Sequence, residues 1–220
     1  MTARDLMSDH VTTVQLSASL PETVRLMRDL LLTQIPVLDE QKFIGLLVID
    51  DMPTQNQEDF MLSDLQKFFR KAAVLPQAHL FDVVKAAIQY QCKAVVVVDA
   101  EQHFMGLISA EICLRQIGQL SSVQDSGGVL ELEIPVRDFS LTDLSRIIEQ
   151  NDVKILGLFT HLDTVHSLWT VTMKLNRVDL GETISSLERH GYSVSGVYQE
   201  ENYTEDLKDR YDALMRFLNI

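Results

Sequence analysis

The sequence predicts a mixed α+β protein, and three observations predict it. The sequence pattern of residues about 11–51 is repeated sixty positions later in residues about 71–111. Within each copy, apolar residues at helical spacing alternate with short continuous apolar runs of strand length. Beyond residue 128, strand and helix patterns follow one another in the order βαββαβ. We therefore expect two parts, a stacked pair of repeats and a separate α+β domain.

The repeat is defined by positions that match across sixty residues: Leu20 with Leu80, Val24 with Val84, Val37 with Val97 and Asp39 with Asp99. Each copy is too small to bury its own apolar faces, so the two copies are expected to pack together. Packed units leave clefts between them, and small ligands usually bind in clefts. The first 120 residues therefore predict a sensor of small molecules.

The first copy reads as strand, helix and two further strands. Residues 11–16 predict a short extended stretch, and Ser19 is suited to cap the following helix, with Pro21 at an early helical position. Residues 35–38 and 43–49 predict two strands covered on both faces. The helix is expected to bury one apolar face, formed by Val24, Met27, Leu30 and Leu31.

The second copy repeats this order with other residues. An entry strand at 74–75 precedes the helix, and the β-branched run at 94–98 favours a buried strand. A strand at 104–109 and a closing helix at 110–120 follow. The inward face of the first helix is predicted to hold Leu80, Val84, Ala87 and Ile88.

The second part follows a polar, glycine-containing stretch at 121–128 that predicts a flexible linker. Apolar and polar residues alternate over 130–136, which predicts a strand with one buried and one solvent-exposed face. Ser140 is suited to cap the next helix. The order βαββαβ, a split ferredoxin-like arrangement, is completed by strands at 153–160 and 167–175, a helix at 180–190 and a strand at 194–198. The tail, 201–220, predicts an amphipathic helix with Leu207, Tyr211, Leu214 and Leu218 at helical spacing, packed on its own domain or on a partner chain.

Charge and composition exclude several classes of function. The 220 residues carry a formal net charge of -13, which repels polyphosphate backbones, so no nucleic-acid partner is expected. Arg70 and Lys71 come nearest to a basic patch. No apolar run reaches the length of a membrane span, and the N-terminus lacks an apolar signal core. Cys92 and Cys113 suggest neither a metal site nor a disulfide framework. We expect a cytoplasmic protein with no membrane association.

Residues 1–120 resemble a tandem pair of CBS domains, the Bateman module. The resemblance rests on the opening segment 5–8, the segment 11–14, the strand 35–39 and the turn into 45–47. It implies a non-catalytic regulatory unit, with one domain at 1–60 and the other at 61–120. It also implies an effector between the two domains, an adenine nucleotide (AMP or ATP) or S-adenosylmethionine.

The family's ligand signature runs glycine, two apolar residues, Thr or Ser, two variable residues, then Asp. Its hydroxyl meets phosphate and its carboxylate accepts hydrogen bonds from the ribose hydroxyls. The first copy begins the signature at Gly45 and keeps Asp51, but Val48 replaces the hydroxyl. The second copy keeps the hydroxyl as Ser109, but Ile112 stands where the carboxylate belongs. Each copy therefore retains one half of the signature.

By resemblance, the ligand-binding set is Thr12, Thr13, Ile35, Pro36, Asp51, Val96 and Ser109. The residues alone leave other roles open. Asp51 and Ser109 are both suited to cap helices, strand propensity alone explains the threonines, and the clefts are equally well filled by side chains.

Residues about 129–200 resemble an ACT domain, a family of amino-acid-sensing modules. The turn after the first strand keeps Asp138 but places Leu141 where the family has glycine, and a side chain there blocks the close approach of a ligand. We therefore expect this domain to pair two chains, for instance through the edge strand 194–198. The order CBS–CBS–ACT resembles the acetoin-utilisation protein B group of bacterial CBS proteins.

The sequence carries no serine nucleophile elbow, phosphate-binding loop or dinucleotide fingerprint, so no catalytic residue and no enzyme are expected. His161, Asp163 and His166 share one turn, where they either hold a metal or are solvated turn residues; we expect no metal and no required cofactor. Two hypotheses follow. The first is a regulatory homodimer that binds an effector and acts on a client protein. The second is a ligand-free assembly or adaptor protein that uses both module types for dimerisation.

Overall fold

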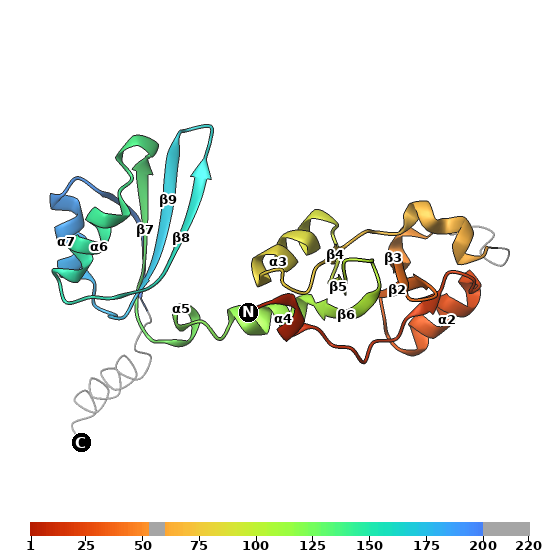
Figure 1. The fold of residues 1–220 in the computed structure, drawn as a ribbon. Coiled ribbons are helices and arrows are strands. Elements are labelled where there is room, and N and C mark those ends of the chain that lie inside the picture. Colours follow the sequence, from red (N-terminus) through yellow and green to blue (C-terminus); the bar gives the residue numbers. More distant parts are fainter. Residues whose placement is uncertain (53–59, 200–220) are drawn as a thin grey trace, which may run out of the picture. The chain divides into compact units, whose positions relative to one another are not determined.

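The structure, a computed structural model, describes residues 1–52 and 60–199 and divides into two compact units, Met1–Ile117 and Gly118–Ile220 (Figure 1). The predicted tail helix at 201–220 lies outside the described residues. Among the described helices, none combines the length and the apolar character needed to cross a bilayer.

The first unit contains the predicted repeat as two three-stranded sheets with the same strand order. In the first copy, β1 (Val14–Gln15) pairs in parallel with β2 (Gln34–Asp39), which pairs antiparallel with β3 (Lys42–Val48). In the second copy the corresponding strands are β4 (Ala73–Val74), β5 (Ala94–Val98) and β6 (Phe104–Ser109). The helices are α2 (Leu20–Asp29) in the first copy, then α3 (Leu80–Gln89) and α4 (Ala110–Ile117) in the second.

The helix boundaries follow local chemistry that the two copies share. Ser19 caps α2 as predicted, because its hydroxyl accepts a hydrogen bond from the backbone N–H of Glu22 at 3.4 Å. After each helix the chain turns through a residue with positive φ, Leu31 (56°) in the first copy and Gln91 (52°) in the second. These two residues are sixty positions apart, so the repeat extends to the backbone conformation at the helix end.

The predicted inward faces of the helices are partly wrong. Leu31 is 90% exposed and Leu30 is 47% exposed, because α2 ends at Asp29 and the turn carries both side chains away from the core. In α3, Ile88 is 72% exposed, and the buried face is made by Leu80, Val83 and Ala86. The sequence places apolar residues on two sides of α3, and only one side faces the sheet.

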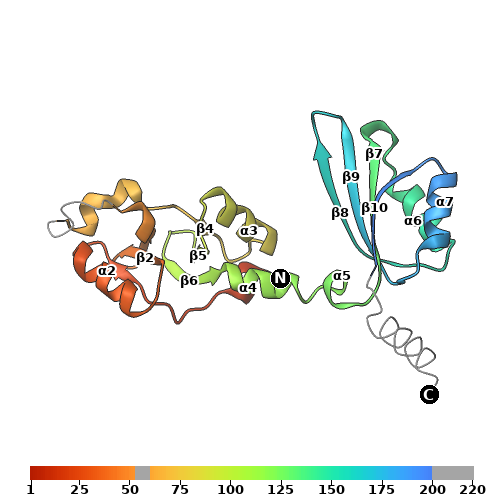
Figure 2. The same cartoon turned by 180° about the vertical axis from the view of Figure 1, so that it is seen from behind.

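The two segments that open the copies are exchanged. The first opening segment, residues 1–8 with α1 (Ala3–Leu6), packs on the second copy, where Ala3 and Leu6 join the core of Leu80, Val83 and Ile108. Figures 1 and 2 both show the N-terminus beside α4. The second opening segment, residues 61–70 with η3 (Leu62–Phe68), packs on the first copy with Leu62 and Leu65 against Leu20 and Met27. Each copy therefore completes its core with a segment of the other.

A cluster drawn from both copies joins them, and we call it the seam. It consists of Leu38, Phe43, Leu46, Ala72, Cys92, Val96 and Val98. Backbone hydrogen bonds reinforce it, from Phe43 N–H to the Gln102 carbonyl and from Phe104 N–H to the Gln41 carbonyl, both at 2.9 Å. The apolar faces of the copies are thus pressed together, as expected for units that cannot bury these faces alone.

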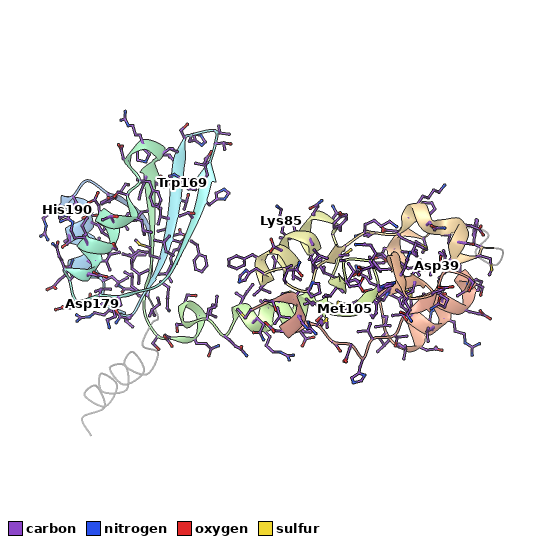
Figure 3. The ribbon with its side chains drawn as sticks, viewed as in Figure 1. Asp39, Lys85, Met105, Trp169, Asp179 and His190 are labelled. Atoms are coloured by element: carbon purple, nitrogen blue, oxygen red, sulfur yellow. The ribbon has the colours of Figure 1, made fainter. Side chains whose placement is uncertain are left out.

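The second unit is a four-stranded antiparallel sheet in the order β10-β7-β9-β8. Two helices cover one face of the sheet (Figures 1 and 2). The core of this unit is dominated by Leu130, Leu132, Ile134, Leu144, Ile147, Ile148, Val171, Met173, Leu175, Leu180 and Leu187, with Trp169 packed against it (Figure 3). The elements are β7 (Val129–Pro135), η4 (Val136–Asp138), α6 (Leu141–Glu149), β8 (Ile155–Asp163), β9 (Leu168–Leu175), α7 (Gly181–Arg189) and β10 (Ser193–Tyr198).

The stretch predicted as a flexible linker, 121–128, is more ordered than its composition indicates. Its first half is one helical turn, α5 (Ser121–Gln124), and Ser122 lies against the backbone of Gly157 in β8. Gly127 and Gly128 are buried, and the Gly127 carbonyl accepts a hydrogen bond from Lys174 Nζ at 2.8 Å. The glycines are required for close packing here, because a Cβ on Gly127 would lie 1.8 Å from the Leu175 carbonyl oxygen.

Candidate functional site

The glycines that begin the two signatures lie beneath the exchanged opening segments. A Cβ on Gly45 would lie 2.6 Å from the Cβ of Phe69, and a Cβ on Gly106 would lie 2.6 Å from the carbonyl oxygen of Ser8. Only glycine permits the opening segment to approach each strand this closely. Each signature is therefore covered by the segment that opens the other copy.

The carboxylate that ends the first signature is paired. Arg70 Nε donates to Asp51 Oδ2 and Arg70 Nη2 donates to Asp51 Oδ1, both at 2.6 Å, which makes a two-pronged ion pair. The side chains are 22% and 28% exposed, respectively, so water screens the pair less than it screens a surface pair. Asp51 ends the short η1 turn (Ile49–Asp51) and caps no helix among the described residues.

Arg70 also holds the second copy. Its Nη1 donates to the carbonyls of Tyr90, at 3.2 Å, and Gln91, at 2.5 Å, which follow the C-terminus of α3. Its backbone pairs with Leu46 of β3 through hydrogen bonds of 2.8 and 3.0 Å. The hydrogen bonds with Asp51 raise the pKa of the Arg70 guanidinium, so it stays charged. One side chain therefore connects the Asp51 carboxylate to the negative end of the helix dipole of α3.

The neighbours of Arg70 are engaged in structure as well. Lys71 Nζ donates to the carbonyl of Ile44, so the pair of basic residues seen in the sequence forms internal contacts. The buried thiol of Cys92 lies 3.4 Å from the Tyr90 carbonyl, and burial raises its pKa, which keeps it protonated.

The second signature lacks this ion pair. Ser8 pairs with Leu107 in β6 as Arg70 pairs with Leu46 in β3, so a serine occupies the place of the arginine. The position of Asp51 is taken by Ile112. The hydroxyl of Ser109 accepts a hydrogen bond from the Ile112 backbone N–H at 3.3 Å, which is the capping role. The two copies of the repeat thus differ in charge at these two equivalent positions.

The remaining predicted site residues do not all point to one place. Val96 is fully buried in the seam, and Pro36 is buried opposite Leu46, a seam residue. Ile35 points to the other side and is fully buried in the core of the first copy beneath α2. Thr12 is exposed and Thr13 half-buried in the stretch before β1. The structure thus brings Pro36 and Val96 to the seam, and directs Ile35 away from it.

Arg70 was not predicted as a site residue. The available signal was the repeat itself, which aligns Arg70 with the end of the first opening segment and so with the position covering a signature glycine. The pairing joins residues 19 positions apart across two copies, and no helical or strand period indicates it.

Possible metal ligands occupy two turns. Between β5 and β6, ligand atoms of Asp99, Glu101 and His103 lie within 4.8 Å of one another. Backbone hydrogen bonds from His103 lower the pKa of Asp99, and Asp99 Oδ2 lies 3.0 Å from His103 Nδ1, so the cluster is a hydrogen-bonded turn. Of the three residues predicted to share the β8–β9 turn, His161 and Asp163 lie at the end of β8, and Asp163 pairs with His166 of the turn at 2.6 Å.

The fold and the two glycine-led signatures define a protein with two paired α+β repeats. Residues 3–52 match the family model of the CBS domain, so the chain contains a CBS domain. Three solved structures are similar to this chain. One is a CBS domain pair/ACT domain protein from Thermotoga maritima, with 19% identity, 53% of this chain and 96% of that chain covered, and a TM-score of 0.46.

The second is CBSX2 in complex with AMP, with 19% identity, 55% of this chain and 98% of that chain covered, and a TM-score of 0.44. The third is the CBS domain of a bacterial CNNM/CorC family Mg2+ transporter in complex with ATP, with 16% identity, 53% and 87% covered, and a TM-score of 0.46.

Proposed function

We propose that this protein is a non-catalytic regulator whose two repeats form a CBS pair that binds an adenine nucleotide beside Asp51. The family match covers the first copy, and the second copy repeats its strand order, its helix end and its signature glycine. CBS domains often bind nucleotides. The observation that supports the site most directly is the position of Asp51 at the end of the first signature, beside the segment that links the copies.

The chemistry at Asp51 suits a ribose. A carboxylate accepts hydrogen bonds from both vicinal hydroxyls of a diol, and Asp51 is partly exposed. Thr12, Thr13, Pro36, Val96 and Ser109 remain the proposed lining of the ligand site, together with Ile35 as a residue that shapes β2. AMP, ATP and S-adenosylmethionine are the candidate effectors.

Binding is tested by thermal unfolding of the full chain with AMP, ATP and S-adenosylmethionine added separately. A ligand at 100 times its dissociation constant stabilises the folded protein by about 2.7 kcal/mol. We expect Asp51→Asn to abolish the shift and Asp50→Asn, at the exposed neighbouring carboxylate, to preserve it. No shift with any of the three ligands rejects nucleotide sensing.

We further propose that the second unit is an ACT domain with the ferredoxin-like arrangement, and that it pairs two chains and relays the state of the CBS pair to a client protein. The support is the strand order β10-β7-β9-β8 with edge strands β8 and β10. In the turn after β7, Leu141 is 51% exposed at the first position of α6, where the ACT family has glycine. Pairing therefore suits this domain better than amino-acid binding. A cytoplasmic location is proposed because Cys92 and Cys113 are free buried thiols.

A second candidate function, ligand-free assembly, is favoured by an apolar face on the second copy. On the outer side of α3, Phe81 is 66% exposed and Ile88 is 72% exposed, and Leu114 of α4 is 70% exposed. The equivalent positions on α2 are Pro21 and Arg28, so the fold itself does not require this face to be apolar. Figure 3 shows Lys85 projecting from this side of α3.

Between the two helices runs a groove of about 360 Å³, lined mainly by Val84, Ala87, Ile88, Cys113, Leu114 and Ile117. We propose that a second copy of the chain covers it, because an exposed apolar patch of this kind is typical of an interaction surface and two equal copies most often pair through the same patch. The groove lining contains no acidic residue in a chain of net charge -13, so this face minimises repulsion between copies.

Sedimentation tests this assembly role. Ile88→Lys combined with Leu114→Lys is expected to lower the mass in solution, and Leu31→Lys, on the exposed turn of the first copy, is expected to leave it unchanged. An unchanged mass in the double variant rejects this face as the interface.

A further inference from the structure

The inference concerns Arg70 and rests on the proposed nucleotide site. We propose that Arg70 is the specificity-determining residue of that site. The two vicinal hydroxyls of a ligand displace the Arg70 guanidinium from Asp51, and an anionic group of the same ligand then forms an ion pair with the guanidinium. Ligands that carry phosphate are thereby selected over neutral nucleosides.

The first step is competition for one carboxylate. Both oxygens of Asp51 accept a hydrogen bond from Arg70 at 2.6 Å in a two-pronged geometry. A vicinal diol uses the same two-pronged geometry on a carboxylate. A ribose therefore binds Asp51 by displacing the guanidinium.

The second step is the fate of the displaced charge. Arg70 is only 22% exposed, and its other hydrogen bonds go to the neutral carbonyls of Tyr90 and Gln91. A neutral ligand would leave this guanidinium without an anion in a partly desolvated place, which is costly. A phosphate matches the fork of the guanidinium as well as a carboxylate does. An anionic ligand therefore exchanges one ion pair for another.

The third step is the asymmetry of the repeat. Ser8 and Ile112 occupy the places of Arg70 and Asp51 in the second copy, so neither member of the pair is present there. Selection for an anion is therefore expected at one site per chain.

Isothermal titration of the full chain with AMP and with adenosine tests the inference. The wild type is expected to bind AMP about tenfold to a hundredfold more tightly than adenosine, the range of a charge-assisted hydrogen-bond pair. Arg70→Gln should reduce this ratio to near one. Arg25→Gln, which removes the same charge from an exposed pair with Asp29, should keep it.

Equal binding of AMP and adenosine by the wild type, or an unchanged ratio in Arg70→Gln, overturns the role of Arg70 while leaving the nucleotide site in place. Absence of binding by both AMP and adenosine overturns the proposed site itself. If Arg70→Gln does not fold, Arg70→Lys decides. Lysine keeps the positive charge but lacks the two-pronged donor geometry of a guanidinium. A ratio of AMP affinity to adenosine affinity equal to that of the wild type would contradict the two-pronged exchange.

Discussion

The hydroxyl of Ser109 caps α4 by accepting a hydrogen bond from the Ile112 backbone N–H at 3.3 Å. Removing a serine cap costs about 1 kcal/mol. Ser109→Ala should therefore lower the free energy of unfolding in urea by about that amount, and Ser140→Ala, at the corresponding cap of α6, should do the same.

A second variant at Ser109 separates capping from ligand contact. If Ser109 only caps, Ser109→Asp keeps both stability and AMP binding, because Asp caps as well as Ser does. A loss of AMP binding with stability retained would place the Ser109 side chain close to the phosphate, because the new carboxylate repels it.

Gly106 tests the crossing of the first opening segment over the second copy. A Cβ at this position would lie 2.6 Å from the Ser8 carbonyl oxygen, so Gly106→Ala must push a backbone segment aside. We expect a loss of about 1–3 kcal/mol in the free energy of unfolding. Gly181→Ala is the matched control, since its Cβ would meet only Asp179 Oδ1 at an ordinary 3.5 Å. Equal stability of the two variants would contradict the crossing.

Leu46 tests the seam. Its side chain is fully buried among residues of both copies, so Leu46→Ala is expected to cost about 2–5 kcal/mol. Leu31→Ala removes the same atoms from a side chain that is 90% exposed, and should change the stability by less than about 0.5 kcal/mol. Denaturation curves of the two variants that coincide would show that the copies do not share a core.

His166 and Asp163 predict a pH effect in the β8–β9 turn. Their hydrogen bond raises the pKa of His166 above its ordinary 6.5 and lowers the pKa of Asp163 to about 2. The contribution of the raised histidine is present at low pH and is lost as the pH rises through its folded value. The contribution of the lowered carboxylate is present above its ordinary pKa and is lost as the pH falls toward 2.

NMR titration of the imidazole checks this directly. The His166 pKa in the wild type should exceed 6.5, and it should fall in Asp163→Asn. If the His166 titration curve is unchanged in Asp163→Asn, the hydrogen bond between Asp163 and His166 does not form in solution.

Much of the first unit could be predicted because its signals are local. Ser19, the apolar strands and the sixty-residue repeat each depend on neighbouring residues or on a period. The exposure of Ile88 could not be predicted, because Ile88 is as apolar as Val83, and a period does not say how far around α3 the buried face extends. The predicted residues Val84 and Ala87 do pack against the core. The side to which Ile35 points met the same limit, since β2 is apolar on both faces, and its role at a ligand site stays a prediction.

Only one member of the Asp51–Arg70 pair could be predicted from the sequence. Asp51 ends a recognisable signature, but its partner Arg70 enters from the segment that opens the other copy. Long-range pairing of this kind depends on how the copies cross, which a one-dimensional pattern does not record.

The exchange of opening segments has a consequence for how the chain acquires its structure. A first repeat severed after residue 52 would retain α1 but lack the hydrophobic surface that α1 covers, and would miss Leu62 and Leu65 from its own interior. The duplicated stretch visible in the sequence is therefore not the cooperative unit. Each repeat completes its interior with residues supplied by the other, so we expect the two repeats to unfold together in a single transition.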